Sequence, residues 1–519
     1  MHDVAAANAA SGPMVASTNA LGPDPERRAQ RRGRATLSDL VVPASLLLFA
    51  AVWLAHLAFT SLSPPTDDIE QLTWVRSLEW GYYKHPPLPT WLIWLPVRLF
   101  GLSNWTAYAL GASLTLTALA LYWRLLVRLR GPTYAGVALM AAMCITYYNG
   151  RLNYYNHNIV LLLVSTACAA LTWQAFTTRR LRWWVALGLA IGLGALAKYQ
   201  IAVTIVSILA FATHQRAWRD PSHRRGAWTA ALVALIVFAP HLAWLQSHDF
   251  APIQYAVESS LGAHFGPATR ASASVHWLID QVFNRALPAL LLLAMAASPF
   301  NRSTTRPQDG RDAMPSVESG AARALLLAWG LVPLIFMPLV GVLLGADLQL
   351  QWGTPFLLFA VPALMELTPS RNWRRVNLQG AAKTFMVLQL LLLTLSHLAS
   401  PRGPAWAQDR HWRTFDSLQL AELVGMPARN ALQGPIRIVI GSASVAGALS
   451  LRLVEHPLVL IDNRFDRSPW VPRELLQQCG ALEIGDIETL AQGQPVGPAF
   501  PHLAWRVIKP DASAASCPA

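Results

Sequence analysis

Charged residues are scarce in this chain of 519 residues. Asp, Glu, Lys and Arg together make up 13% of it, whereas 54% of the residues are hydrophobic. A soluble globular protein carries about 25% charged residues, so the composition excludes an ordinary soluble enzyme. Hydrophobic runs of about 20 residues recur along the sequence instead, and this pattern is typical of a protein that crosses a membrane many times.

Acidic residues are scarcer than basic ones. The chain has 28 Asp and Glu against 41 Lys and Arg, which gives a net charge of +13. In a soluble protein such an excess would indicate a nucleic-acid partner. Here most arginines stand in short segments between hydrophobic runs, where they orient the chain in the membrane. We therefore expect membrane lipids, and no nucleic acid, around this protein.

Cysteine is also rare, with four residues in the whole chain. Cys144 and Cys168 stand in hydrophobic runs and are interpreted as packing residues. Cys479 and Cys517 stand in the polar tail and would pair if that tail lies in an oxidising compartment. No Cys/His spacing resembles a structural zinc site. Carboxylates leave a divalent metal open, but no clear ligand set supports one, so neither a metal site nor a cofactor is predicted.

The hydrophobic runs predict an all-α polytopic membrane protein with about eleven transmembrane helices. Residues 1–37 form a basic leader, which the positive-inside rule places in the cytoplasm, and residues 38–400 form the membrane domain. The predicted spans are 39–62, 105–123, 132–148, 159–177, 183–197, 199–213, 227–246, 286–300, 323–344, 352–368 and 381–399. The arginine clusters between them then fall on one side, and the loops at 63–100, 149–158, 198–200, 247–284 and 345–351 fall on the other, outer side.

Residues 401–519 have a different pattern, because their apolar runs are too short to span a membrane. The segment PIRIVIGSASVAGALSLRL predicts a strand, a Gly turn and a helix, and HPLVLIDNRF and LAWRVIKP predict two further strands. We expect a small α/β domain on the outer face.

The stretch that organises the sequence is residues 66–96. It begins with the carboxylates Asp67, Asp68 and Glu70 and continues to the basic pair Lys84 and His85, which precedes two prolines. Trp and Tyr residues stand between the charges, and these side chains favour the membrane–water boundary. We interpret the stretch as a catalytic loop on the outer membrane surface.

Charges beside membrane spans are expensive unless paired or hydrated, so they indicate function. Glycosyl transfer from a lipid-phosphate sugar fits the charges on the outer loops. Fixed cations would stabilise the leaving phosphate, a carboxylate would act as general base, and aromatic rings would hold the sugar. Asp67 is the predicted base, with Asp68 beside it. The predicted phosphate contacts are Lys84, His85, Arg151 and Lys198, and the predicted substrate contacts are Glu70, Tyr82, Tyr83, Asn156, Asn158, Tyr199 and Trp352.

Each of these features also has a purely structural explanation. Asp68 or Thr66 would cap the helix that runs through Trp74, and Lys84-His85 would form a solvated turn. Lys198 would be a lysine that extends from a span end toward water. Residues 153–158 would be an interfacial aromatic belt with capping asparagines, and Asp347 would be a solubilising loop residue.

The motif DDIEQLTWVRSLEWGYYKHPPLPTWL resembles the bacterial members of the dolichyl-phosphate-mannose–protein mannosyltransferase superfamily, including lipid-A aminoarabinose transferases. Four more segments look similar to that superfamily in the same order: NYYNHNIVLLL, GLAIGLGALAKYQIAV, FAPHLAWLQSHDF and LQLQWGTPFLL. The resemblance covers about residues 38–400, and the tail is similar to the outer domain of some members.

The resemblance implies a GT-C fold and an inverting transferase in the bacterial inner membrane, with a periplasmic C-terminal domain. It implies a polyprenyl-phosphate-linked sugar as donor, used on the outer face, and places the catalytic carboxylate at Asp67. The second carboxylate is usually Glu in the superfamily and is Asp68 here. In the aminoarabinose branch a functional lysine precedes the two prolines, where this chain has His85, with Lys84 beside it. Asn156, Asn158 and Lys198-Tyr199 match the family's second outer loop and its Lys-Tyr tip.

Two functions of different classes follow from the sequence. The first is a glycosyltransferase that moves a sugar from a polyprenyl-phosphate donor to lipid A, protein or an envelope glycan. The second is a lipid-linked solute transporter or flippase, in which the outer charges would form a substrate gate. Transporters place charges near the middle of the bilayer, whereas these charges stand mostly at span ends, which favours the transferase. The sequence leaves the sugar, the acceptor and the oligomeric state open.

Overall fold

The structure is a computed structural model that describes residues 37–260, 266–301, 316–369, 373, 376–408, 412–512 and 516–518. The predicted basic leader therefore lies outside the described residues except for Leu37. The same holds for most of the polar segment at 301–322 between two predicted spans.

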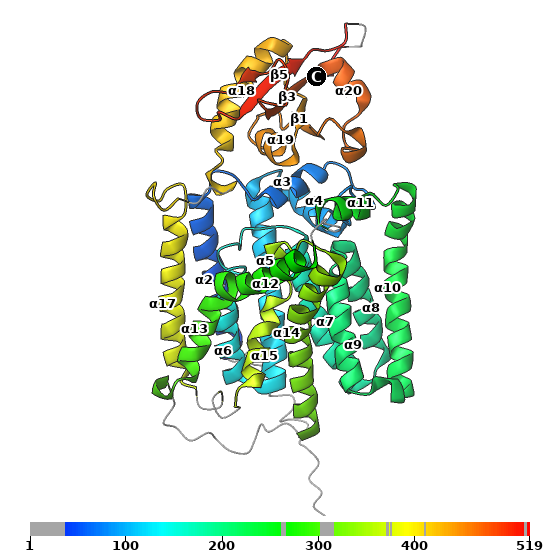
Figure 1. Ribbon diagram of the computed structural model, residues 1–519, viewed down its shortest axis with the longest axis vertical. Coiled ribbons are helices and arrows are strands. Elements are labelled where there is room, and N and C mark those ends of the chain that lie inside the picture. The colour runs from blue at the N-terminus through cyan, green and yellow to red at the C-terminus, as the bar shows by residue number, and fades with distance from the viewer. Residues whose placement is uncertain are drawn as a thin grey trace, which may run out of the picture. The chain divides into compact units, whose positions relative to one another are not determined.

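Helices make up most of the chain up to residue 398 (Figure 1). Seven helical stretches among the described residues are long and apolar enough to cross a membrane. They are α2 (Leu37–Thr60), α5 (Asn104–Arg130), α7 (His157–Thr178), α10 (Pro221–Ser247), α14 (Ser316–Leu344), α17 (Leu378–Leu398), and α12 (Pro267–Asp280) joined to α13 (Leu287–Ala297) by a π-helical turn at Gln281–Ala286.

Shorter apolar helices lie among these seven. They are α4 (Leu88–Phe100), α6 (Pro132–Met143), α8 (Leu181–Ala197), α9 (Ile201–His214) and α15 (Ala360–Leu367). Every predicted span coincides with a long or a short helix, so the multi-pass helical architecture is confirmed. The number of crossings, eleven, stays a prediction.

The segment 247–284, predicted to be an outer loop, is largely helical. It contains α11 (Ala251–Ser259) and α12, and α12 continues into the next predicted span. Ser, Thr, Arg and His give α12 the composition of a loop, but its Trp277 is buried and donates a hydrogen bond of 3.1 Å to the carbonyl of Gln349. One apolar face is therefore enough to hold this polar segment as a helix.

Small residues bring α8 and α10 close together. A Cβ atom added to Gly188 would lie 2.9 Å from the Cα of Ala230, and one added to Gly192 would lie 2.7 Å from the Cβ of Val237. Such close approach through glycine is a common way to pack helices in membranes. This packing holds α8 in place and therefore also positions Lys198, which directly follows the last residue of α8.

The C-terminal part contains a five-stranded sheet in the order β2-β1-β3-β5-β4. The strands are β1 (Ile438–Gly441), β2 (Leu458–Ile461), β3 (Ala481–Asp486), β4 (Gln494–Pro495) and β5 (Leu503–Ile508). β1 runs parallel to both β2 and β3, and β5 is antiparallel to β3 and β4. Helices α18 (Ser417–Leu432), α19 (Ala443–Ser450) and α20 (Arg473–Cys479) complete the α/β domain.

The predicted strand–Gly–helix unit is β1 followed by α19, and the two other predicted strands are β2 and β5, so these predictions are confirmed. Cys479 and Cys517, whose pairing the sequence left open, form a disulfide.

The α/β domain packs on α3 (Thr66–Trp74), a helix of the organising stretch. Gly447 of α19 lies so close to Ile69 that a Cβ atom would overlap the Ile69 side chain. Arg76 adds a hydrogen bond of 2.9 Å to the carbonyl of His456, and Arg452 adds one of 3.2 Å to the carbonyl of Leu62. The helix that carries Asp67 is thus held from the side of the C-terminal domain.

Candidate active site

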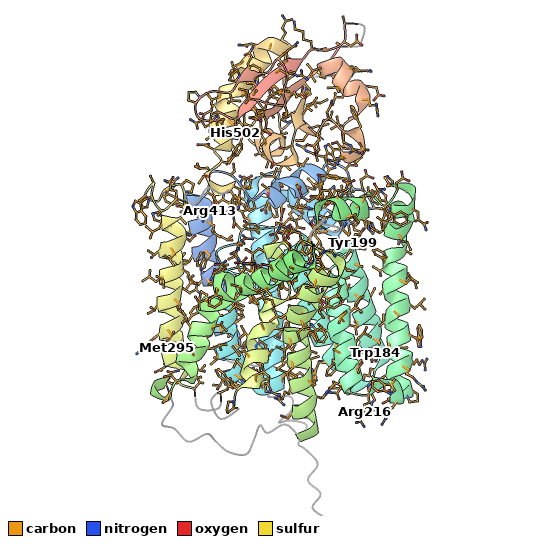
Figure 2. All side chains as sticks on the ribbon, viewed as in Figure 1. Trp184, Tyr199, Arg216, Met295, Arg413 and His502 are labelled. Atoms are coloured by element: carbon orange, nitrogen blue, oxygen red, sulfur yellow. A yellow bond between two sulfur atoms is a disulfide. The ribbon has the colours of Figure 1, made fainter. Side chains whose placement is uncertain are left out.

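The predicted site residues come from separate segments that meet at one end of the helices. They stand on α3, on the segment before α4, at the start of α7, in the α8–α9 turn and in the turn Leu350–Gly353, which contains Trp352. Figure 2 shows Tyr199 at the end of the helices that is nearer to the sheet, whereas Arg216 lies at the opposite end. The turn that contains Tyr199 therefore lies at the opposite end of the helices from the arginine-rich loop that contains Arg216.

Asp67 and Asp68 stand side by side in the first turn of α3 but bind different partners. The side-chain amide of Asn156 donates a hydrogen bond of 2.9 Å to Asp67 Oδ2. The backbone N–H of Tyr155 donates one of 2.9 Å to Asp68 Oδ1. The residue that caps α3 is Pro65, and no side chain makes a cap hydrogen bond. The capping explanation for this carboxylate pair is therefore wrong.

Asp68 is fully buried, and its Oδ2 atom has no hydrogen-bond partner. Burial raises the pKa of Asp68 well above its usual range, against the opposing effect of the Tyr155 N–H, and nearby Asp67 raises it further. Asp67 remains partly exposed. Of the two carboxylates, Asp67 is accessible and Asp68 ties α3 to the segment before α7, which supports Asp67 as the base.

Lys84 forms an ion pair with Glu70, with 2.7 Å between Nζ and Oε1. The two side chains are only 19% and 11% exposed, so Lys84 is not part of a solvated turn. Its Nζ also lies 5.5 Å from the ring centre of Tyr255 on α11. Burial lowers the pKa of Lys84, but attraction by Glu70, Asp67 and Tyr255 outweighs burial and raises it above the ordinary lysine value. Lys84 is therefore a fixed positive charge.

Glu70 is the matching buried acid. Burial raises its pKa, attraction by Lys84 opposes that rise, and Asp67 adds to it.

Lys198 is a buried cation without a carboxylate partner among the described residues. The side chain is 9% exposed, so it does not extend into water. Nζ donates a hydrogen bond of 2.8 Å to Asn158 Oδ1 and lies 5.4 Å from the ring centre of Trp352. Burial lowers the pKa of Lys198 to about 7, attraction by Asp67 opposes this shift, and repulsion by Lys84 adds to it. A buried ammonium with this environment is a ready partner for an anion.

His85 lies within electrostatic reach of both lysines and faces a second histidine. Its ring centre is 4.0 Å from that of His157, the first residue of α7. Burial lowers the pKa of His85 well below its usual range, and repulsion by His157, Lys84 and Lys198 lowers it further. A neutral His85 can donate or accept a hydrogen bond but cannot neutralise a phosphate. His157 is 4% exposed, and its Nε2 atom has no hydrogen-bond partner.

His157 was not assigned a role of its own from the sequence. The two ring centres are 4.0 Å apart although the residues are 72 apart along the chain, and the place of His157 between two candidate asparagines was the signal that pointed to it.

Asn156 and Asn158 are both buried. Asn156 caps α7 by accepting a hydrogen bond of 3.1 Å from the Ile159 N–H, so the capping explanation holds for this residue. Because its amide also bonds Asp67, capping and site geometry are combined in one side chain. Asn158 instead uses its amide oxygen, which accepts the hydrogen bond from Lys198.

Tyr199, beside Lys198, is linked to the organising stretch through His241 of α10. The Tyr199 hydroxyl and His241 Nε2 are 2.8 Å apart, and His241 Nδ1 is 2.6 Å from the carbonyl oxygen of Trp80. The neighbouring Gly81 leaves no room for a Cβ atom against the Trp244 ring. These contacts fix the segment between Trp80 and Lys84 against α10.

Three other predicted residues have different surroundings. Tyr82 is 3% exposed and stacks on Trp74 at 4.9 Å, so its place is in the core. Tyr83 is half-buried and lies under the guanidinium of Arg467, 5.0 Å away. Arg151 lies 5.1 Å from the ring centre of Tyr154 and 5.9 Å from that of Tyr147, rather than beside a lysine. Asp347 is exposed, as expected of a solubilising residue.

Within the described residues no group of three or more His, Cys, Asp and Glu side chains is arranged to hold a metal ion. The arrangement instead offers one accessible carboxylate, two lysines and two neutral imidazoles close together. Such a set can take a proton from a hydroxyl while it stabilises a separate anion.

Comparison with known proteins agrees with this geometry. Residues 84–244 match the dolichyl-phosphate-mannose-protein mannosyltransferase family. The lipopolysaccharide core galacturonosyltransferase RgtA of Rhizobium johnstonii is 24% identical over 265 residues, 50% of this chain and 53% of that protein. The lipid A galacturonosyltransferase RgtD of the same organism is 27% identical over 198 residues, 36% of this chain and 40% of that protein. The chain thus matches about half, or less, of the length of these relatives.

Among solved structures, ArnT from Cupriavidus metallidurans bound to undecaprenyl phosphate has a TM-score of 0.56 and 16% identity, over 94% of this chain and 100% of that chain. At this identity the likeness shows the fold, which is the predicted GT-C fold. The resemblance read from the sequence is confirmed, since residues 84–244 match the dolichyl-phosphate-mannose-protein mannosyltransferase family.

Proposed function

We propose that this protein is an inverting glycosyltransferase that moves a sugar from a polyprenyl-phosphate donor to a hydroxyl group of an envelope acceptor. The observation that carries the proposal is the placement of an accessible Asp67 within electrostatic reach of both Lys84 and the buried Lys198. An enzyme of this kind needs an acid–base group and an anion site close together, and the site supplies both.

In the proposed reaction the acceptor oxygen attacks the anomeric carbon of the donor sugar. The acceptor proton passes to Asp67 while the bond between the anomeric carbon and the phosphate oxygen breaks. The electron pair of that bond stays on the polyprenyl phosphate, whose new charge Lys198 and Lys84 stabilise. His85 and His157, both close to the lysines, would donate hydrogen bonds to the phosphate without adding charge.

The relatives named above act on lipid A and the lipopolysaccharide core, which favours one of these over protein as acceptor. They also transfer galacturonic acid. Two buried lysines suit a donor with two anionic groups, a phosphate and a carboxylate, so we propose a uronic acid as the sugar.

We further propose that the site faces the periplasmic side of a bacterial inner membrane, with the N-terminus in the cytoplasm. The disulfide between Cys479 and Cys517 supports this orientation, because disulfides persist in oxidising compartments. A lipid-linked solute transporter or flippase remains the alternative. It is disfavoured because the candidate groups lie at helix ends and in loops, whereas transporters build their substrate sites from interrupted helices.

The test is Asp67→Asn, with Asp347→Asn as the matched control. The first variant should still bind the donor, but its single-turnover transfer rate should fall about 10²–10⁴-fold, because the general base is lost. The control removes an exposed carboxylate of the same face and should keep the parental rate. Transfer by Asp67→Asn at the parental rate would exclude Asp67 as base, and facilitated lipid movement without any transfer would favour the flippase.

A further inference from the structure

The C-terminal domain contains a cavity of about 330 Å³ that the proposed reaction does not use. It lies at the carboxyl ends of the parallel strands β1, β2 and β3. Gly441 ends β1 and Ser442 follows it, Asp462 follows β2, and Gly485 and Asp486 end β3. The chain runs from β1 to β2 on one side and then to β3 on the other. In open α/β sheets, ligands bind at such a reversal of strand order.

The lining is built from two kinds of group. Its floor is apolar and includes Ile440, Val445 and Leu503. Its polar groups are hydroxyls, an amide and carboxylates: Ser442, Thr489, Asn463, Asp462, Glu483 and Asp486. A volume near the lower end of the range of about 300–1,000 Å³ for ligand pockets suits one or two sugar rings.

The lining has acidic but no basic side chains, which disfavours anionic ligands. None of the lining residues is basic. Asp462 pairs with Arg467 at 2.9 Å and Glu483 pairs with Arg506 at 2.6 Å, and both arginines stand outside the lining. Asp486 has no ion-pair partner among the residues that the structure describes. A phosphate or a uronate would meet carboxylates and no cation, and the described residues contain no metal-binding group.

The backbone around the cavity is fixed in a specific shape. Gly441 lies so close to the carbonyl oxygen of Ile484 that no side chain fits there. Asp462 and Asn463 both have left-handed backbone conformations, with φ of 51° and 56°. Asn and Asp tolerate this conformation, which recurs at ligand-binding segments.

We propose that this cavity binds an uncharged or amino-bearing saccharide. Sugar hydroxyls, and an ammonium group where present, would donate hydrogen bonds to the carboxylates of Asp486 and Asp462, while the C–H face of the ring would pack on the apolar floor. Hydrogen bonds to an ionised acceptor are the stronger kind, and hydroxyls can also pair with the amide of Asn463 and the Ser and Thr hydroxyls.

Residues 462–467 connect the cavity to the candidate active site. Asp462 lines the cavity, and its partner Arg467 lies 5.0 Å from the ring centre of Tyr83, the neighbour of Lys84. A saccharide held here would therefore be part of the acceptor. This assignment to the acceptor rests on the proposed function, whereas saccharide binding does not.

Saturation-transfer NMR of the full chain in lipid nanodiscs tests the proposal. The probes are the methyl glycosides of a neutral hexose and of a 2-amino-2-deoxyhexose, with methyl galacturonoside and inorganic phosphate as anionic probes. The two hexosides should bind and the anionic probes should not. Asp486→Asn should weaken binding about tenfold, because one charge-assisted hydrogen bond loses its charge.

Gly485→Phe is the blocking variant, since a Cβ atom at this lining position meets no atom within 4 Å and the ring can fill the cavity. Gly434→Phe is its matched control, because Gly434 has equal space but lies outside the cavity. Gly485→Phe should abolish binding and Gly434→Phe should keep it. No binding of either hexoside, preferential binding of the anionic probes, or unchanged binding in Gly485→Phe and Asp486→Asn would overturn the proposal.

In a transfer assay, Gly485→Phe should raise the KM for the acceptor and leave kcat unchanged. An unchanged KM, with hexoside binding lost, would refute the acceptor assignment while the transferase stands. Full transfer by Asp67→Asn would refute the proposed base while the saccharide site stands.

Discussion

Raising the pH should release a polyprenyl-phosphate sugar from this protein, because Lys198 loses its proton near neutrality. Burial holds the pKa of its ammonium at about 7 in the free protein, so the protonated fraction falls from about nine-tenths near pH 6 to about one-tenth near pH 8. The donor phosphate is a diester and keeps one charge throughout. If only the protonated form binds it, the apparent Kd rises about tenfold between these two pH values.

Lys84 and His85 keep their charge states in this window. The pKa of Lys84 is raised by its acidic neighbours and that of His85 is lowered by burial, so Lys84 stays charged and His85 stays neutral. The pH dependence can therefore be assigned to Lys198 by substitution.

The assay is microscale thermophoresis of the full chain in nanodiscs, with the donor titrated from near pH 6 to near pH 8. Lys198→Gln should bind weakly at every pH. Lys198→Arg should bind with little pH dependence, because a guanidinium stays protonated. His85→Gln is the control and should retain the pH slope. A parental Kd that does not change with pH, or a slope that persists in Lys198→Arg, would refute the assignment of the donor anion to Lys198.

Three further predictions follow from the same structure. Glu70→Gln should lower the free energy of unfolding, measured by denaturant titration, by about 3–5 kcal/mol, since it leaves the buried Lys84 unpaired. The double variant Glu70→Gln, Lys84→Gln should recover part of this loss. If the losses of the two single variants simply add in the double variant, the ion pair does not stabilise the fold. Replacement of Cys479 and Cys517 by Ser should lower the free energy of unfolding by about 2–4 kcal/mol, as expected when a disulfide that joins residues 38 positions apart is removed. Identical unfolding midpoints of the parent with and without reductant would contradict this prediction. Finally, between about pH 7 and the ordinary lysine pKa of 10.5, Lys198 is protonated in the unfolded chain but not in the folded protein. The stability of the parent relative to Lys198→Gln should therefore rise with pH across this window. A difference in melting temperature between the two proteins that does not change with pH would disprove this prediction.

The sequence predicted the site best where membrane topology alone brings residues together. Asp67 and Lys84 stand in one predicted outer loop and Lys198 in another, and the alternation of spans puts such loops on one surface whatever the packing of the helices. The resemblance of the motif around residues 66–96 then supplied the roles. The strand–Gly–helix unit at 438–450 was also predictable, because the period of its hydrophobic residues changes at a glycine.

The sequence could not predict which side chains contact one another. Glu70 and Lys84 were assigned to substrate and phosphate, yet they bind each other, and this pairing depends on how the segment after α3 folds back. Tyr82 and Tyr83 are indistinguishable in the sequence, but the first stacks inside the core and the second reaches the surface of the site. Likewise, β3 has a polar residue in each half, and its place at the centre of the sheet follows only from its pairing with β1 and β5.

The contact between Gly447 and Ile69 limits how this protein can be taken apart or recombined. Removal of the residues after about 400 would leave an isoleucine of the Asp67 helix facing water, and a domain from a relative with any larger residue at the glycine position would push that helix aside. A chimera that exchanges the C-terminal domain would therefore have to exchange the matching surface of α3 with it, so the two surfaces must change together during evolution.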